Sequence, residues 1–112
     1  MKNFKKLLIL STLIPMLSQA ATVSWYGPGF HGKRTASGEV FNQNTYTAAS
    51  NSHKIGTKLR VTNLKTKQSV VVRINDTGGF KKYGRTLDLS KAAFSKIAPI
   101  SQGIAKVRID VL

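Results

Sequence analysis

Three acidic side chains stand where predicted elements begin or end, and they are the residues best suited to acid–base chemistry. Glu39 lies in a glycine-containing turn, Asp76 follows a valine-rich strand, and Asp88 lies two residues before a predicted helix. Functional groups are commonly displayed at such boundaries, and a carboxyl group can donate and later accept a proton. Each also has a structural interpretation, as a solvated loop residue, an Asx-turn cap and an element cap respectively. Position alone leaves both roles open.

Acidic residues are scarce in this basic chain. Its 112 residues include 18 lysines and arginines but only four acids, and the formal net charge is +14. The fourth acid, Asp110, falls inside a predicted strand and is interpreted as an ordinary exposed residue. A surface that served only solubility would mix acidic and basic residues. The scarcity of acids therefore suggests that the few present have functional roles. So high a charge favours polyanionic partners such as nucleic acid, anionic lipid or a wall polymer.

Metal and thiol chemistry are not expected. The chain has no cysteine, which excludes thiolate ligands, a cysteine nucleophile and a thioether lipid anchor. His31 and His53 lie too far apart in sequence to form a ligand pair of the usual spacing. We therefore predict no metal site and no cofactor.

Aromatic residues gather around glycines early in the chain. Trp25, Tyr26 and Phe30 surround Gly27 and Gly29. Such rings either pack in a core or stack on sugar rings, and the sequence leaves both interpretations open.

The N-terminus predicts a secretory signal peptide, residues 1–20. Lysines precede an apolar run, residues 7–17, and Ser18 and Ala20 supply small residues before a cut after Ala20. As a helix, the apolar run spans about 16 Å, too short for a bilayer core of roughly 30 Å. We therefore expect an exported protein, periplasmic or secreted, without stable membrane insertion or a lipid anchor.

The remaining residues, 21–112, are expected to form one monomeric domain. Its net charge falls from +14 to +11 because the signal removes three lysines and no acid. Anionic polymers of the cell envelope are the expected binding partners of this positively charged domain, since export makes nucleic acid the least available polyanion.

Hydrophobic patterning predicts a mainly β fold with one short helix. The expected strands are residues 22–26, 46–49, 58–64, 69–75, 85–89 and 104–112, and the expected helix is 91–98, with Ser90 as N-cap. Ala93, Phe94 and Ile97 recur at helical spacing, which predicts that they face the core. Leu59, Val61 and Leu64, and likewise Val107, Ile109 and Val111, are expected on one side of their strands. Six short strands favour a small closed barrel.

In order along the chain, these segments resemble the double-psi β-barrel domain of the rare lipoprotein A family, which is related to barwin and the expansins. The resemblance is carried by ATVSWYG (21–27), GFHG (29–32), TASGE (35–39), TAA (47–49), RVTNL (60–64), SVVVRIND (69–76), GR (84–85) and DLS (88–90). It covers nearly the whole of residues 21–112 without large gaps.

The resemblance implies a pseudo-two-fold, six-stranded barrel with a glycan groove across one face. It further implies a peptidoglycan lytic transglycosylase, which cleaves the MurNAc–GlcNAc bond and leaves 1,6-anhydro-MurNAc ends. The family's acids match Glu39 and Asp76, and the important acid of the expansins matches Asp88. The substrate contacts expected with them are Trp25, Tyr26, Phe30, Ser50, His53 and Arg85.

The chain departs from the family pattern at two places. Ser50 stands where family members usually have a histidine tied to activity, and His53 follows three positions later. The family's Asp-Arg-Gly-Pro-Phe segment is Asp-Thr-Gly-Gly-Phe at residues 76–80, which loses a base and a rigid proline.

Our mechanistic hypothesis assigns Asp76 as general acid and base. Glu39 is its electrostatic partner and substrate orienter, and Asp88 is a third candidate whose role is left open. An unperturbed aspartic acid is only about one part in a thousand protonated at pH 7. Desolvation or a nearby carboxylate must therefore offset the positive charge of the domain, and we expect the three acids to converge on one groove.

Two alternatives remain. One is a non-catalytic, expansin-like module that grips glycan without cutting it, and Ser50 supports it. The other is a secreted cationic protein that targets lipopolysaccharide, membrane or nucleic acid, although no amphipathic basic helix or aromatic–basic motif favours it.

Overall fold

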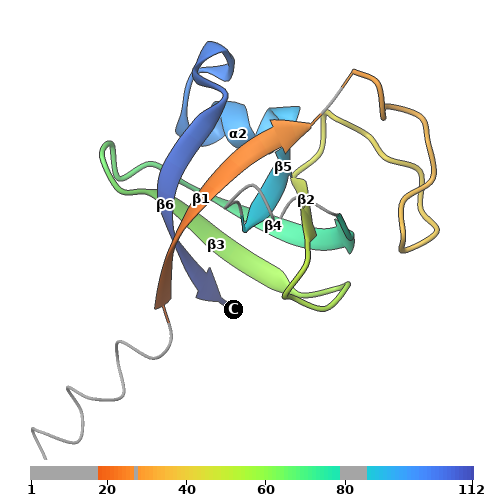
Figure 1. Cartoon of the computed structure of the whole chain (residues 1–112), viewed down its shortest axis with the longest axis horizontal. Helices are drawn as coiled ribbons and strands as arrows, with labels where there is room; N and C mark the ends of the chain where they lie inside the picture. The colour runs from red at the N-terminus through yellow and green to blue at the C-terminus, as the bar shows by residue number, and fades with distance from the viewer. Residues whose placement is uncertain (1–17, 27, 79–85) are drawn as a thin grey trace, which may run out of the picture.

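The computed structural model describes residues 18–26, 28–78 and 86–112, which form six strands, a short α-helix and a 3-10 helix (Figure 1). The elements are β1 (Ser18–Tyr26), β2 (Thr47–Ser50), β3 (Lys58–Asn63), β4 (Ser69–Asp76), β5 (Leu87–Ser90), α2 (Lys91–Ile97), η3 (Ile100–Gln102) and β6 (Ile104–Val111). Most of the predicted signal peptide, Gly27, Phe80 and Arg85 lie outside the described residues. Within the described part of the chain, no helix is long and apolar enough to cross a membrane.

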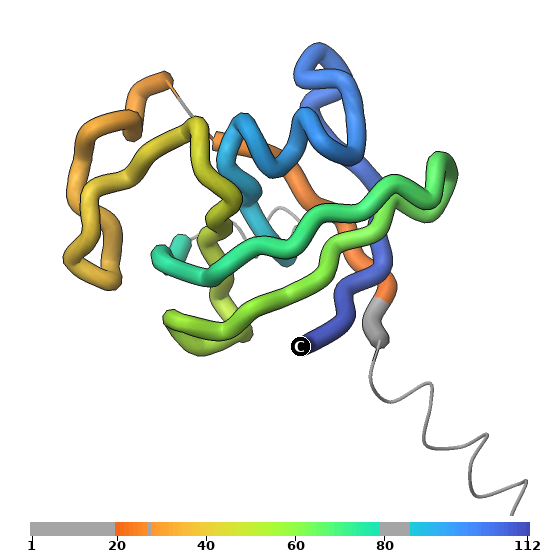
Figure 2. Tube along the Cα trace, turned by 180° about the vertical axis from the view of Figure 1, so that it is seen from behind, coloured from red at the N-terminus to blue at the C-terminus, as the bar shows by residue number. Residues whose placement is uncertain are grey.

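The strands close into a ring in the order β1-β5-β2-β4-β3-β6. Two neighbouring pairs, β1 with β5 and β2 with β4, are parallel, and the other pairs are antiparallel. Figure 2 shows the same ring from behind, with the long hairpin of β3 and β4 crossing one side. Because each of these strands has a neighbour on both sides, the described residues contain no edge strand. The predicted small, mainly β, closed barrel is therefore confirmed.

The core follows from the alternation of the long strands. Val70, Val72 and Ile74 of β4 point inward, as do Val107 and Ile109 of β6, and all five are buried. Side chains alternate between the two faces of a strand, so the residues between these positions face outward.

The predicted helix is α2, and it packs against β4, β5 and β1. Its buried residues are Ala93, Phe94 and Ile97, as the spacing predicts. The Ser90 hydroxyl accepts a hydrogen bond from the amide of Ala93 at 3.2 Å, which confirms Ser90 as the N-cap.

Two residues predicted on the inner faces are exposed instead. Leu64 is 41% exposed because β3 ends one residue earlier, at Asn63, and Leu64 begins the turn to β4. Val111 is 58% exposed because it lies beyond Asp110, the last residue of β6 that pairs with β1. Alternation therefore predicts the inward positions only as far as both neighbouring strands continue.

Strand β1 is longer at its N-terminus than predicted. Ser18, Gln19 and Ala20 pair with Asp110, Ile109 and Arg108 of β6, so the predicted cut after Ala20 falls inside β1. Such a cut would leave the pairing of residues 21–24 with β6 unchanged. The length of β1 is set by its partner β6, which local sequence does not reveal. The division into residues 1–20 and 21–112 stays a prediction.

Candidate active site

A β-bulge in β4 orients Asp76. Ala48 of β2 pairs with Ile74, but the next residue, Ala49, pairs with Asp76, so Asn75 is an extra residue in β4. Without this register shift, Asn75 would lie opposite Ala49, and Asp76 would face the other way. The bulge thus places Asp76 on the same face of the sheet as Ala49.

Asp88 lies on the other side of the same alanine. Ala49 pairs with Asp88 of β5, and Asp88 pairs in turn with Ser24 of β1. Cross-strand partners share a face, so Asp76 and Asp88 flank Ala49 with their Cα atoms about 10 Å apart, two strand spacings. The hydroxyl of Ser24 donates a hydrogen bond to Oδ1 of Asp88, which is half-buried. The fold therefore brings these two acids together over a small side chain.

One oxygen of Asp76 is held by the backbone. Oδ1 accepts hydrogen bonds from the amides of Ala36 and Thr77, both at 2.9 Å. The described residues donate no hydrogen bond to Oδ2, and the side chain is half-buried. The carboxyl group is thus fixed through one oxygen, and the other remains able to exchange a proton.

The hydroxyl of Tyr26 lies close enough to Asp76 and Asp88 for both charges to affect its pKa. Burial raises the pKa of this phenol above its ordinary value of 10.0, and the negative charges of Asp76 and Asp88 raise it further. The hydroxyl oxygen is buried and has no hydrogen-bond partner among the described residues. Tyr26 therefore keeps its proton at neutral pH, and a buried donor without a partner costs roughly 1–3 kcal/mol.

The three predicted aromatic contacts have different surroundings. The ring of Tyr26 is stacked on Phe41, with centroids 4.5 Å apart, and meets the edge of Phe30 at 5.5 Å. Trp25 packs against the core, and its Nε1 donates to the carbonyl oxygen of Ile100 at 3.2 Å. Phe30 is 53% exposed. Of the three, Phe30 therefore offers an open ring, whereas the hydroxyl of Tyr26 is buried.

Glu39 is bound to residues of β4. Its carboxylate accepts hydrogen bonds from Nη2 of Arg73, at 2.9 and 3.2 Å, and from Nδ2 of Asn75, at 2.6 Å. The Asn75 hydrogen bond, followed by that of Arg73, lowers the pKa of Glu39. Glu39 is therefore ionised at neutral pH and does not supply a proton. It attaches the turn of residues 35–39, which also provides the Ala36 amide, to the strand that carries Asp76.

The lowered pKa of Glu39 predicts a pH-dependent contribution to stability. Below its ordinary pKa of 4.5, the unfolded state takes up the proton first, so the contribution is present above pH 4.5 and is lost as the pH falls through the lowered value. Because the pair is partly exposed, we expect Glu39→Gln to lower the melting temperature by only about 2–4 °C at neutral pH.

Thermal unfolding between about pH 2 and pH 8 measures this effect. The difference between Glu39→Gln and the wild type should close at the acidic end, where both side chains are neutral. Asp110→Asn, which removes an acid paired with Arg108 at 3.2 Å, is the control for the loss of one charge elsewhere. A difference of the same size at both ends of the range would contradict the prediction.

Ser50 and His53 form a small turn next to Ala49. The Ser50 hydroxyl accepts hydrogen bonds from the amides of Ser52, at 3.1 Å, and His53, at 2.9 Å. The same oxygen lies 3.2 Å from Nδ1 of His53. Ser50 is 1% exposed, whereas His53 is half-buried, so the imidazole is the accessible group of the pair.

Sequence reasoning missed the residues that position the acids. Ser24, Arg73 and Asn75 were not singled out, although Arg73 and Asn75 stand within three positions of Asp76. Their proximity to Asp76 in β4 was the only available signal, because the bulge depends on pairing with β2. The predicted contact Arg85 lies outside the described residues, and within those residues no three His, Cys, Asp or Glu side chains could together hold a metal ion.

Comparison with solved structures supports this architecture. The chain is similar to the Streptomyces papain inhibitor, with a TM-score of 0.68, 20% identity, and coverage of 85% of this chain and 94% of that one. It is also similar to a single-residue mutant of an expansin from Clavibacter michiganensis, solved in complex with cellohexaose, with a TM-score of 0.66, 20% identity, and coverage of 85% and 50%. At these identities, the similarity concerns the fold alone, a double-psi β-barrel.

Sequence comparison adds closer relatives. The chain is 55% identical over 89 residues to a probable endolytic peptidoglycan transglycosylase RlpA of Synechocystis, covering 80% of this chain and 27% of the relative. It is 52% identical over 89 residues to the Campylobacter jejuni endolytic peptidoglycan transglycosylase RlpA, covering 80% and 32%. The chain thus spans about a third or less of the length of these two relatives. The family model described as lytic transglycolase matches residues 18–109, and the chain belongs to this family.

Proposed function

We propose that the protein is a peptidoglycan lytic transglycosylase that cleaves the MurNAc–GlcNAc bond and leaves 1,6-anhydro-MurNAc ends. The observation that carries this proposal is the placement of Asp76 and Asp88 on either side of Ala49, with the Tyr26 hydroxyl subject to both charges. Similarity to relatives named endolytic peptidoglycan transglycosylases supports the choice of substrate.

In this proposal, Asp76 transfers a proton in both directions through Oδ2. Its protonated form donates to the glycosidic oxygen as an oxocarbenium-like centre develops at the muramyl anomeric carbon. The muramyl 6-hydroxyl then attacks that carbon, and its proton passes to the Asp76 carboxylate. No water is consumed, because the attack is intramolecular and positioning replaces a second nucleophile.

The remaining site residues position or stabilise these groups. Asp88, held by Ser24, supplies the negative charge on the opposite side of Ala49, which stabilises the oxocarbenium-like centre. The Tyr26 hydroxyl, which is buried in the free fold, becomes accessible when the glycan binds and donates to a sugar oxygen between the two acids. Glu39 keeps the turn of residues 35–39 against β4 and thereby the Ala36 amide on Asp76.

The outer contacts are assigned to exposed groups. Phe30 stacks on a sugar ring, and the His53 imidazole, oriented by Ser50, contacts the strand. Arg85 and Trp25 complete the proposed set, with Trp25 supporting the site from the core side.

The proposed setting is the cell envelope. The protein is exported to the periplasm or secreted as a monomer, and the net charge of +11 on residues 21–112 concentrates it on anionic envelope polymers. Neither nucleic acid nor a bilayer interior is a proposed partner.

Digestion of purified peptidoglycan sacculi tests the function. We expect the protein to release soluble muropeptides with anhydro ends, identified by mass spectrometry. Sedimentation of the protein with sacculi that yield no anhydro-ended product would support the non-catalytic glycan-binding alternative instead.

A further inference from the structure

Two positive side chains lie directly opposite each other on the outer face of the barrel. Lys58 of β3 pairs with Arg73 of β4 in the antiparallel hairpin. The next pair along, Leu59 and Val72, is buried in the core, so Lys58 and Arg73 point outward. The Cβ atoms of directly opposite residues are about 4.5–5.5 Å apart, and like charges at this spacing destabilise a sheet. The cation pair therefore favours a negative group beside it.

Glu39 balances only one of the two charges. Its carboxylate accepts hydrogen bonds from Nη2 of Arg73, whereas Lys58 forms no ion pair and no side-chain hydrogen bond within the described part of the chain. Nη1 of Arg73 carries two N–H donors and has no partner among the same residues, and the Arg73 side chain is 43% exposed. One positive charge and unused donors thus remain for a further anion.

The cation pair lies on the same face of the sheet as Asp76. Arg73 pairs with Thr47 of β2, and Asp76 pairs with Ala49. Because Thr47 and Ala49 are two residues apart in β2, their side chains share a face and their Cα atoms are about 7 Å apart. A ligand group held by the cation pair therefore lies one step along the sheet from the acids, within reach of the same oligosaccharide.

A carboxylate on the glycan matches these groups in charge and hydrogen bonding. Its oxygens can accept from Nη1 of Arg73 and from the Lys58 ammonium, and charge-assisted hydrogen bonds of this kind are the stronger class. Each muramyl residue of a glycan strand carries a lactyl group. This group ends in a free carboxylate unless a peptide is attached to it, and the attachment converts the carboxylate into a neutral amide. Only the free form would balance the charge of Lys58.

We propose that Arg73 and Lys58 form a subsite for the lactyl carboxylate of a muramyl residue near the cleaved bond. The identity of the sugar rests on the proposed function, whereas the preference for a carboxylate rests on the cation pair. The two cations then determine specificity, because strands with free lactyl carboxylates bind more tightly than strands whose lactyl groups are amidated. Glu39 fixes the guanidinium from Nη2 and leaves Nη1 for the ligand.

Calorimetric titration with two matched oligosaccharides tests the subsite. Both alternate GlcNAc and MurNAc and carry no peptide, but the lactyl carboxyls are free in one and methylamides in the other. The full chain carries Asp76→Asn, so that no cleavage intervenes. We expect the free-carboxylate glycan to bind about tenfold more tightly, and we expect Lys58→Gln to reduce this ratio to about threefold. The melting temperature should not fall, because the substitution removes a like-charge contact.

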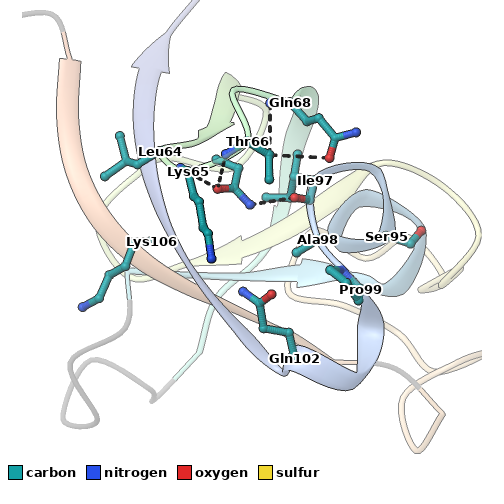
Figure 3. Close-up of a pocket in the computed structure, with 11 residues that line it drawn as sticks. Leu64, Lys65, Thr66, Gln68, Ser95, Ile97, Ala98, Pro99, Gln102 and Lys106 are labelled. Atoms are coloured by element: carbon teal, nitrogen blue, oxygen red, sulfur yellow. Dashed lines mark hydrogen bonds between the residues drawn. The ribbon is translucent and has the colours of Figure 1, made fainter.

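Lys65→Gln is the matched control, because any lost charge on a positive domain weakens anion binding slightly. Lys65 also belongs to the β3–β4 hairpin but lies in the turn at its other end, where Figure 3 shows it beside a separate cavity of about 750 Å³. Strand β3 (Lys58–Asn63) separates the two lysines by about 17 Å, more than the Debye length of about 8 Å, so the ratio should stay near tenfold. Lys58 is substituted because loss of Arg73 would also release Glu39.

Several results would overturn the assignment. They are equal binding of the two glycans, equal effects of Lys58→Gln and Lys65→Gln, and tighter, Lys58-dependent binding of a polyphosphate chain than of either glycan. The proposed function fails by a different observation. Lys58-dependent binding of the free-carboxylate glycan by a wild type that releases no anhydro-ended product from sacculi would refute cleavage alone. Cleavage without any preference between the two glycans would refute the subsite alone.

Discussion

Asp76→Asn is expected to reduce the release of anhydro-ended muropeptides by about 10²–10⁴-fold, the usual contribution of a general acid and base. The amide side chain cannot transfer the proton, so both proposed steps lose their catalyst. Its oxygen can still accept the hydrogen bonds of the Ala36 and Thr77 amides, so the turn of residues 35–39 should remain in place. The substitution therefore separates chemistry from folding.

The measurement is the initial rate of anhydro-muropeptide release from sacculi, with the melting temperature recorded alongside. Asp110→Asn is the control, because it also removes one acid paired within β6 but lies away from Ala49. An unchanged product yield from correctly folded Asp76→Asn would rule out Asp76 as the proton carrier. The rate of the control should equal that of the wild type.

Tyr26→Phe is expected to lower the rate of cleavage by about 10–100-fold while leaving the protein as stable or more stable. In the unliganded fold, the hydroxyl is buried without a partner among the described residues, so removing it relieves a desolvation cost of roughly 1–3 kcal/mol. The phenylalanine ring preserves the stacking on Phe41. The hydroxyl is useful only when a sugar oxygen accepts from it, and activity should therefore fall as stability rises.

Urea unfolding and the sacculus assay, run on the same preparation, test whether stability rises while activity falls. Tyr46→Phe is the matched control, since Tyr46 is 45% exposed and its ring lies 6.0 Å from Nζ of Lys96. Full activity in Tyr26→Phe would remove the hydroxyl from the mechanism. A clear loss of stability would show that the hydroxyl has a partner in the free fold.

The strands and the helix of the barrel could be predicted because alternation, helical spacing and capping are patterns of residues close together in sequence. Alternation in β4 and β6 marked the inward residues, and the N-cap Ser90 with the spacing of Ala93, Phe94 and Ile97 marked α2. The errors occurred where an element depends on its neighbours. The start of β1 is set by its pairing with β6. Leu64 is exposed because β3 ends one residue before it.

The candidate site was likewise only partly predictable from the sequence. The sequence singled out Glu39, Asp76 and Asp88 because acids are rare in a basic chain and these three stand where elements begin or end. It did not distinguish their roles. The contacts of Glu39 with Arg73 and Asn75 lower its pKa and assign it to positioning, whereas the second oxygen of Asp76, which accepts no hydrogen bond from the described residues, suits proton transfer.

By itself, the sequence determined the kind of barrel, the positive charge and the short list of acids, because composition and alternation are properties of neighbouring residues. Only the tertiary structure decided that Asp76 and Asp88 flank Ala49, because this depends on an extra residue in β4 and on two strand pairings distant in sequence. It also decided that the Tyr26 hydroxyl is buried and has no hydrogen-bond partner among the described residues. These features arise from register and packing, which operate between segments rather than along them.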